Sequence, residues 1–377
     1  MKNNIRHLFY FVGLLSAGLV TAQQTATAPL ALQPFVDKHE LAGAIGLVVD
    51  REQVLAIETF GFADIAAGKA MPKNALFWIA SQSKPITATA VIMLVDEGKI
   101  NLDDPVEKYL PEFKGQQVNV GDKRQPPVHP ITVREVLSHM SGLPFKSDVE
   151  NPTLDALPLA EAVASYAKTP LQTEPGTHYQ YSNAGINTSA RILEVVSGMK
   201  YEDFLQERLF DPLGMKDTTF WPNDEQTKRI AKSYRPNAEK NNLDEFQTGQ
   251  LSYPLSHRKT RFPMPAGGLF SSAEDTAKFC QMMLNGGELN GKRYVSEAGF
   301  KALTTRQTPE SVKASYGLGY SVGGDSFGHG GAHASNMTVY PAKGVALIWM
   351  VQHGGFPGEG NKAQGVFKDW ALKQFGK

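Results

Sequence analysis

The alternation of apolar and polar residues predicts strands at both ends of the chain. Near the N-terminus, residues 42–49 and 54–60 are strand-like and flank the polar turn Asp50-Arg51-Glu52-Gln53, the pattern of an antiparallel hairpin. Near the C-terminus, short apolar stretches separated by glycine-rich turns predict four more strands. These are expected at residues 316–322, 326–330, 334–340 and 345–351.

The middle of the chain has mainly helical patterns. Residues 86–95 are apolar almost all round, as expected for a helix that runs through a core, and Gly98 is a stop signal. Thr132 and Glu135 have capping-box spacing at the start of a helix that should end near Gly142. Other helices are expected at residues 30–39, 184–197, 201–209, 271–286 and 362–375, and loops at 116–130 and 221–263.

This order of elements predicts an α/β (α+β) fold. The N- and C-terminal segments would form one antiparallel sheet flanked by helices, with a mostly helical inserted lobe. We expect one domain over residues 23–377, with a sheet lobe of about 23–80 and 290–377 and a helical lobe of about 81–289. The cleft between the lobes is where a site is expected.

The first 22 residues have the pattern of a signal peptide. Lys2 and Arg6 precede an apolar stretch at residues 8–20, and Val20-Thr21-Ala22 offers small residues before a cut. This predicts cleavage after about Ala22, a periplasmic or secreted protein, and no stable membrane span after cleavage. A retained N-terminal anchor is the alternative.

Composition limits the function classes. The 377 residues have a formal net charge of zero, so no basic excess suggests a nucleic-acid partner. The single cysteine, Cys280, excludes an internal disulfide, and its helical surroundings indicate a small core residue. We expect a small-molecule or peptide substrate and no cofactor or metal; the sequence does not give the oligomeric state.

Candidate chemistry begins with Ser81 and Lys84, at the start of the apolar helix. Residues three apart on a helix lie on one face, so a neutral lysine amine could take the proton of the serine hydroxyl. Ser-x-x-Lys alone is a weak signal, because both residues are common and serine is frequent at helix starts.

Two other stretches contain candidate site residues when they are considered together with Ser81 and Lys84. Tyr181-Ser182-Asn183 places a phenol and an amide before a helix, although Asn183 could simply be its N-cap. Gly328-His329-Gly330-Gly331-Ala332 lies among the C-terminal strands, where glycines allow a substrate to approach the backbone; a plain hairpin turn is the alternative.

The three motifs together resemble the serine β-lactamase and penicillin-binding protein superfamily. Their order and spacing are most similar to its class C branch, with D,D-carboxypeptidase and family VIII esterase relatives. The resemblance covers nearly all of the chain after residue 22. Residues 137–144 (LSHMSGLP) and 267–272 (GGLFSS) also look like framework stretches of that family.

The resemblance implies roles for these residues. Ser81 would be the acylated nucleophile, with Lys84 and Tyr181 sharing the task of general base. Asn183 would orient the acyl side of the substrate. His329, with Gly330 and Gly331, would line the opposite wall and orient or protonate the leaving group. The backbone N–H groups of Ser81 and Ala332 would form the oxyanion hole.

One position departs from the lactamase pattern. Lactamases of this branch have Lys-Thr-Gly where this chain has His329-Gly330-Gly331. A histidine is only partly cationic near neutral pH, so it would hold a substrate carboxylate less firmly than lysine. Ester cleavage is therefore ranked slightly ahead of β-lactam or D-Ala-peptide cleavage. A binding or sensor protein that is acylated once without turnover is a second hypothesis.

Two other motifs are set aside. Residues 324–328 (GDSFG) match the G-x-S-x-G nucleophile elbow, but the elbow must lead into a helix, and strand sequence follows Ser326. His329 and His333 are four apart, yet the glycines between them argue against a helical zinc site.

Overall fold

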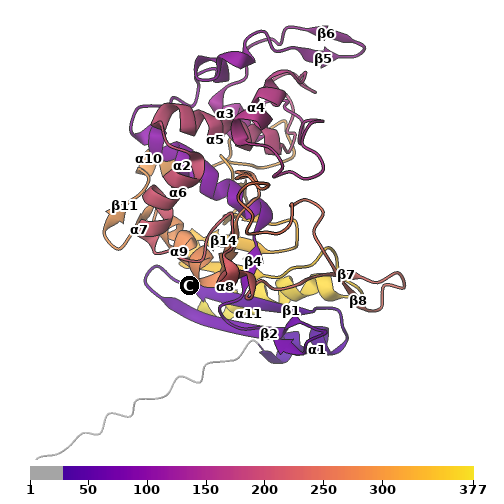
Figure 1. The fold of residues 1–377 in the computed structure, drawn as a ribbon. Helices are drawn as coiled ribbons and strands as arrows, with labels where there is room; N and C mark the ends of the chain where they lie inside the picture. The colour runs from indigo at the N-terminus through magenta and orange to yellow at the C-terminus, as the bar shows by residue number, and fades with distance from the viewer. Residues whose placement is uncertain (1–28) are drawn as a thin grey trace, which may run out of the picture.

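A seven-stranded antiparallel sheet forms the centre of the computed structural model, which describes residues 29–377. The predicted signal peptide therefore lies outside the described residues. The strands are β1 (Gly43–Val49), β2 (Val54–Asp64), β3 (Lys69–Ala70), β12 (Ser321–Val322), β13 (Phe327–Gly330), β14 (Asn336–Tyr340) and β15 (Val345–Met350). Their order is β12-β13-β14-β15-β1-β2-β3. Since β1 pairs with β15, both ends of the chain share one sheet, as predicted (Figure 1).

Strand β1 has an uninterrupted apolar sequence because both of its faces are buried. Successive side chains of a strand point to opposite faces of the sheet. Ile45, Leu47 and Val49 belong to the core on one face, whereas Ala44 and Val48 belong to the core on the other. Because both faces are covered, every residue of this strand is buried.

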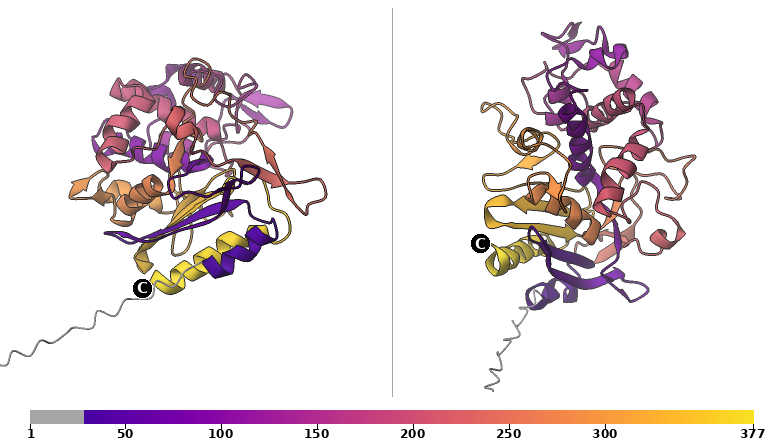
Figure 2. Two further views of the ribbon diagram at one scale, coloured as in Figure 1. Left: turned by 60° about the horizontal axis from the view of Figure 1, so that its bottom comes forward. Right: turned by 90° about the vertical axis from the view of Figure 1, so that its left-hand side faces the viewer.

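Two terminal helices cover one face of the sheet. Helix α1 (Pro29–Asp37) and helix α11 (Ala363–Phe375) lie side by side there, as the left view of Figure 2 shows. The ring of Phe367 on α11 stacks on Trp349 of β15, with 5.4 Å between ring centroids. Contacts of this kind bury the apolar side of the C-terminal helix, which was predicted at nearly these bounds.

The opposite face packs against the helical part of the chain. Helix α9 (Ala273–Leu284), although within the predicted helical lobe, packs on β1, β14 and β15. Its Cys280 is buried, which raises the pKa of the thiol to about 12 and confirms the expectation of a core residue.

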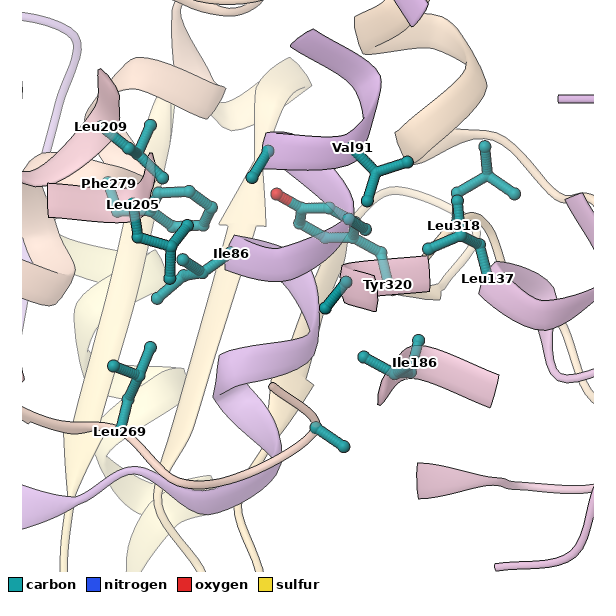
Figure 3. Close-up of a cluster of buried hydrophobic side chains, with 14 of the residues drawn as sticks. Ile86, Val91, Leu137, Ile186, Leu205, Leu209, Leu269, Phe279, Leu318 and Tyr320 are labelled. Carbon is teal, nitrogen blue, oxygen red and sulfur yellow. The ribbon is translucent and has the colours of Figure 1, made fainter. Parts of the chain in front are cut away.

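Helix α2 (Ser83–Asp96) passes through the main core and is buried on all sides from its first residue to Leu94. It packs against α5 (Asn183–Ser197) and α10 (Glu297–Thr304). Figure 3 shows the cluster around it, in which Ile86 and Val91 lie among Leu137, Ile186, Leu205, Leu209, Leu269, Phe279, Leu318 and Tyr320.

Shorter elements complete the fold. The remaining helices are α3 (Val133–Ser138), α4 (Leu159–Ala167), α6 (Tyr201–Leu205), α7 (Asp211–Leu213) and α8 (Asp224–Thr227). Four small antiparallel pairs are β4 (Leu76–Trp78) with β9 (Phe270–Ser272), β5 (Val118–Val120) with β6 (Lys123–Gln125), β7 (Ser233–Pro236) with β8 (Leu243–Phe246), and β10 (Glu288–Leu289) with β11 (Lys292–Arg293). None of the helices within residues 29–377 has the length and apolar character needed to cross a bilayer.

The prediction of a strand at residues 316–322 is wrong for most of these residues. Only Ser321–Val322 is a strand, because the chain turns where Gly317 N–H donates to the Tyr320 carbonyl at 2.8 Å. Gly319 has a φ of +73°, a left-handed conformation that interrupts a strand. The alternating apolar residues of this segment are buried, but they lie in a loop and not in a strand of the sheet.

Helix α3 begins as predicted but ends early. The capping box is present: the Thr132 hydroxyl accepts the Glu135 N–H, and the Glu135 carboxylate accepts the Thr132 N–H. The expected end near Gly142 is wrong, because His139 adopts a left-handed conformation with φ +62° directly after Ser138. Helix α6 likewise continues differently, through a π-helical turn at Gln206–Phe210.

Candidate active site

Ser81 lies in a short 3₁₀ turn, Ala80–Gln82, that leads directly into α2. Its neighbour Ala80 has φ +46°, a conformation that alanine rarely adopts and that surrounding structure must hold. The residues just before Ser81 are held by hydrogen bonds to residues 267–269. Ile79 N–H donates to the Leu269 carbonyl at 3.0 Å, and the Trp78 indole N–H donates to the Gly267 carbonyl at 2.6 Å. Ser81 itself remains partly exposed.

Lys84 lies one turn further along and is completely buried. Its Nζ lies 3.1 Å from Ser81 Oγ, 2.8 Å from Asn183 Oδ1 and 2.7 Å from the Ala266 carbonyl oxygen. Burial lowers the pKa of this amine well below its usual value of 10.5. The buried environment therefore favours the neutral amine.

The geometry around Nζ suits a neutral amine that faces a hydroxyl. A neutral amine has two N–H donors and one lone pair. Asn183 Oδ1 and the Ala266 carbonyl can only accept, so they take both hydrogens. The third direction, toward Ser81 Oγ, is then the one in which the lone pair can accept the hydroxyl proton.

The Tyr181-Ser182-Asn183 loop is fixed by a helix cap. Ser182 is the N-cap of α5, and its Oγ accepts the Gly185 N–H at 2.9 Å. The alternative that Asn183 is the N-cap is therefore wrong, because Asn183 is the first residue inside the helix. Its side chain is free of capping and instead reaches Lys84.

Tyr181 lies over the same amine, with Lys84 Nζ 4.6 Å from its ring centroid. Burial raises the pKa of the phenol above its usual value of 10, although a side-chain hydrogen bond with Ser81 acts in the opposite direction. The pKa values of the two groups thus move apart. The amine is favoured as a proton acceptor, and the phenol stays protonated.

His139 is a buried residue next to this loop to which sequence analysis gave no role. Its Nδ1 accepts the backbone N–H of Ser182 at 3.2 Å, and its ring centroid lies 4.6 Å from that of Tyr181. Burial lowers the pKa of the imidazole well below its usual value. A neutral ring is required here, because protonated Nδ1 could not accept the Ser182 N–H. His139 thereby helps to hold Tyr181 and Asn183 in place.

Residues 330–332 form the wall opposite this loop, at the end of β13. A Cβ atom at Gly331 would lie 2.6 Å from the Ile79 carbonyl oxygen and 2.3 Å from Ser335 Oγ. Only glycine therefore allows this segment to approach the backbone that carries Ser81.

His329 lies behind the wall that residues 330–332 form. Its Nδ1 is 2.6 Å from the Gly330 carbonyl oxygen, and its Nε2 is 3.0 Å from the Tyr316 hydroxyl. The carbonyl can only accept, so Nδ1 carries the proton and Nε2 accepts from Tyr316. Burial lowers the pKa of His329 to about 3. The ring is neutral, and both its nitrogen atoms have partners within the protein.

A cavity of about 310 Å³ opens above Ser81. Its walls combine apolar side chains with a few polar groups, and they contain no charged residue. The lining residues are Trp78, Ala80, Ser81, Phe145, Tyr181, Asn183, Gln250, Met264, Ala266, Gly267, Gly330, Gly331 and Ala332. Seven of the eight predicted site residues thus lie at this cavity or, for Lys84, directly beneath it; His329 is the exception.

The alternative serine of the G-x-S-x-G match has no such setting. Ser326 lies in the turn between β12 and β13, where its carbonyl accepts the Gly323 N–H at 2.6 Å. A strand follows it, not a helix, so the rejection of a nucleophile elbow is confirmed.

The fold and this constellation define a β-lactamase-like protein, and comparison with known proteins agrees. The family model Beta-lactamase matches residues 30–366. The chain therefore belongs to the Beta-lactamase family, whose members are mostly serine hydrolases, and the predicted resemblance and fold class are confirmed.

Relatives and solved structures extend this result. Protein Rv1367c of Mycobacterium tuberculosis is 30% identical over 363 residues, covering 86% of this chain and 88% of the relative. Penicillin-binding protein 4 of Amycolatopsis lactamdurans is 27% identical, covering 84% of this chain and 82% of the relative. Among solved structures, EstCE1, described as a hydrolase with promiscuous acyltransferase activity, matches with a TM-score of 0.74 and 21% identity, covering 90% and 95% of the two chains.

Proposed function

We propose that this protein is an exported serine hydrolase that cleaves carboxylic esters through an acyl-enzyme on Ser81. The observation that carries the choice of ester is the absence of a cation next to the scissile bond. Within the described residues, the wall of the cavity has no charged side chain, Lys84 is buried behind it, and His329 is neutral and hydrogen-bonded elsewhere. An ester with uncharged groups at the reacting carbonyl needs no such cation.

Acylation would use the pKa difference described above. Ser81 Oγ attacks the carbonyl carbon while its proton moves to Lys84 Nζ. The oxyanion would accept hydrogen bonds from the backbone N–H groups of Ser81 and Ala332. As the ester C–O bond breaks, Tyr181 would give its proton to the leaving alcohol and regain one from the Lys84 ammonium. Water would then release the acid by the reverse sequence.

The β-lactam and D-Ala-peptide alternatives are less favoured by this site. Both substrates carry a carboxylate near the bond that is cleaved, and a buried charge without a partner costs free energy. The relatives include proteins named as putative D-alanyl-D-alanine carboxypeptidases and penicillin-binding proteins, at 25% and 27% identity. These relatives make peptide cleavage the alternative to test.

We expect kcat/KM for a short-chain 4-nitrophenyl ester to exceed that for a chromogenic cephalosporin by about 30-fold or more. An unpaired buried carboxylate costs about 2 kcal/mol or more, which corresponds to that ratio. Both substrates are assayed with the same enzyme preparation, alongside D-alanine release from a D-Ala-D-Ala peptide. Faster cephalosporin or peptide turnover would refute the ester assignment. A stoichiometric burst without steady-state turnover would instead indicate a sensor.

A further inference from the structure

A second cavity adjoins the proposed acyl site. Its volume is about 280 Å³, and it shares two wall residues, Phe145 and Gln250, with the cavity above Ser81. The Phe145 carbonyl accepts the N–H of Asn183 at 3.1 Å, so this cavity lies on the side of the site where Asn183 is expected to meet the acyl group. The full lining is Phe145, Lys146, Pro152, Thr153, Leu154, Gly249 and Gln250.

The walls of the second cavity are held together by buried polar contacts. Leu154 N–H donates to the Gln250 carbonyl at 3.0 Å and joins the two loops that form the cavity. Beneath them, the buried carboxylate of Asp155 accepts from Arg261 Nε at 2.7 Å and from the Ser252 N–H at 2.9 Å. A buried ion pair with further hydrogen bonds gives this wall a defined position.

Lys146 is the one charged residue among the residues that line this cavity. Its Nζ donates to the Glu150 carbonyl at 2.9 Å and to Asn151 Oδ1 at 3.0 Å, and both acceptors are uncharged. Two acidic residues, Asp148 and Glu150, lie close to Lys146 in the sequence. Asp148 is exposed and does not line the cavity, and the buried Glu150 carboxylate accepts from Ser147 N–H and from the Tyr166 hydroxyl. Burial raises the pKa of Glu150, and the charge of Lys146 acts in the opposite direction. Within the described residues, the third N–H of the Lys146 ammonium has no hydrogen-bond acceptor.

We infer that the second cavity is an acyl-chain subsite that takes a carboxylate at the far end of the chain, bound by Lys146. The inference rests on the proposed function, because it assigns the acyl part of the ester. Apolar walls from Phe145, Pro152 and Leu154 would cover a methylene chain, and the ammonium would meet an anionic terminus. The substrate class is therefore a monoester of a medium-length dicarboxylic acid, uncharged at the reacting carbonyl and negative at its other end.

The experiment compares two substrates that differ only in terminal charge. One is the 4-nitrophenyl monoester of suberic acid, and the other is the same compound with its free carboxylate capped as a methyl ester. We expect kcat/KM to favour the charged substrate by about fivefold at low ionic strength, since a partly exposed ion pair contributes up to about 1 kcal/mol. Added salt should reduce this preference.

Lys146→Met should remove the preference by lowering kcat/KM for the charged substrate to about that for the capped ester. Lys123→Met is the matched control, since Lys123 is an exposed lysine on the β5–β6 hairpin (Figure 1) and lines neither cavity. It should keep the wild-type preference.

The subsite and the proposed function can be disproved separately. A preference that is absent in the wild type, or unchanged in Lys146→Met, overturns the subsite and leaves ester hydrolysis intact. Failure to hydrolyse either suberate ester, together with the short-chain ester, overturns the proposed function and the subsite with it.

Discussion

Replacing Ser81 by alanine should lower ester turnover by a factor of about 10⁴ or more, because the variant lacks the hydroxyl proposed to form the acyl-enzyme. Ser81 Oγ is the hydroxyl at the floor of the cavity that lies 3.1 Å from the Lys84 amine. The side chain is partly exposed, so the variant should fold with a melting temperature close to that of the wild type. Steady-state hydrolysis of a 4-nitrophenyl ester measures the loss.

Ser326→Ala is the matched control for this variant. It removes the serine of the G-x-S-x-G match, which lies in the β12–β13 turn. Its turnover should stay within about twofold of the wild type. Retained activity in Ser81→Ala, or loss in Ser326→Ala, would show that the nucleophile has been assigned to the wrong serine.

Replacing Lys84 by methionine should lower kcat by a factor of about 10² to 10⁴, the range typical of a lost general base. Methionine keeps much of the side-chain length but offers no lone-pair nitrogen to Ser81. Lys84→Arg separates a base from a simple positive charge, since a guanidinium stays protonated. Both variants should be slow; an active Lys84→Arg enzyme would contradict the role of base.

The pH dependence of the wild type tests the same role. Below the pKa of Lys84 the amine is protonated and cannot accept the serine proton, so kcat/KM should rise as pH rises through that pKa. The rise should occur well below pH 10.5, because burial lowers the pKa of Lys84. The His329 pKa of about 3 means that His329 should add no step near pH 6.5. The rising limb should be absent in Lys84→Met.

Much of the candidate site could be predicted because its parts follow local rules. Ser81 and Lys84 are one helical turn apart, so their proximity follows from sequence spacing. The meeting of this pair with Asn183 depends on packing between α2 and α5, which no local pattern gives. There the family resemblance, and not the residues alone, supplied the prediction.

The behaviour of individual groups was harder to predict. His329 was expected at the wall, but a turn in residues 316–320 places the Tyr316 hydroxyl against its Nε2. The same turn lies where a strand was predicted. Because that prediction was wrong, neither the turn nor the hydrogen bond between Tyr316 and His329 was expected. His139 was missed as a site residue because its left-handed backbone and complete burial depend on tertiary structure.

Two of the elements that were missed differ in why they were missed. Helix α4 has buried residues at Leu159, Ala162, Val163 and Tyr166, a helical spacing that was present in the sequence and could have been used. The hairpin of β5 and β6 differs, because Lys123–Gln125 is exposed and polar. Its pairing comes from the turn at residues 121–122 and not from an apolar pattern.

The most direct test of the central claim is the mass of the intact protein after reaction with a fluorophosphonate, followed by fragmentation to locate the adduct. We predict one adduct per chain, on Ser81 and not on the neighbouring Ser83, and no adduct in Ser81→Ala. An adduct on another residue of the wild type, or an unchanged rate of labelling in Lys84→Met, would contradict it.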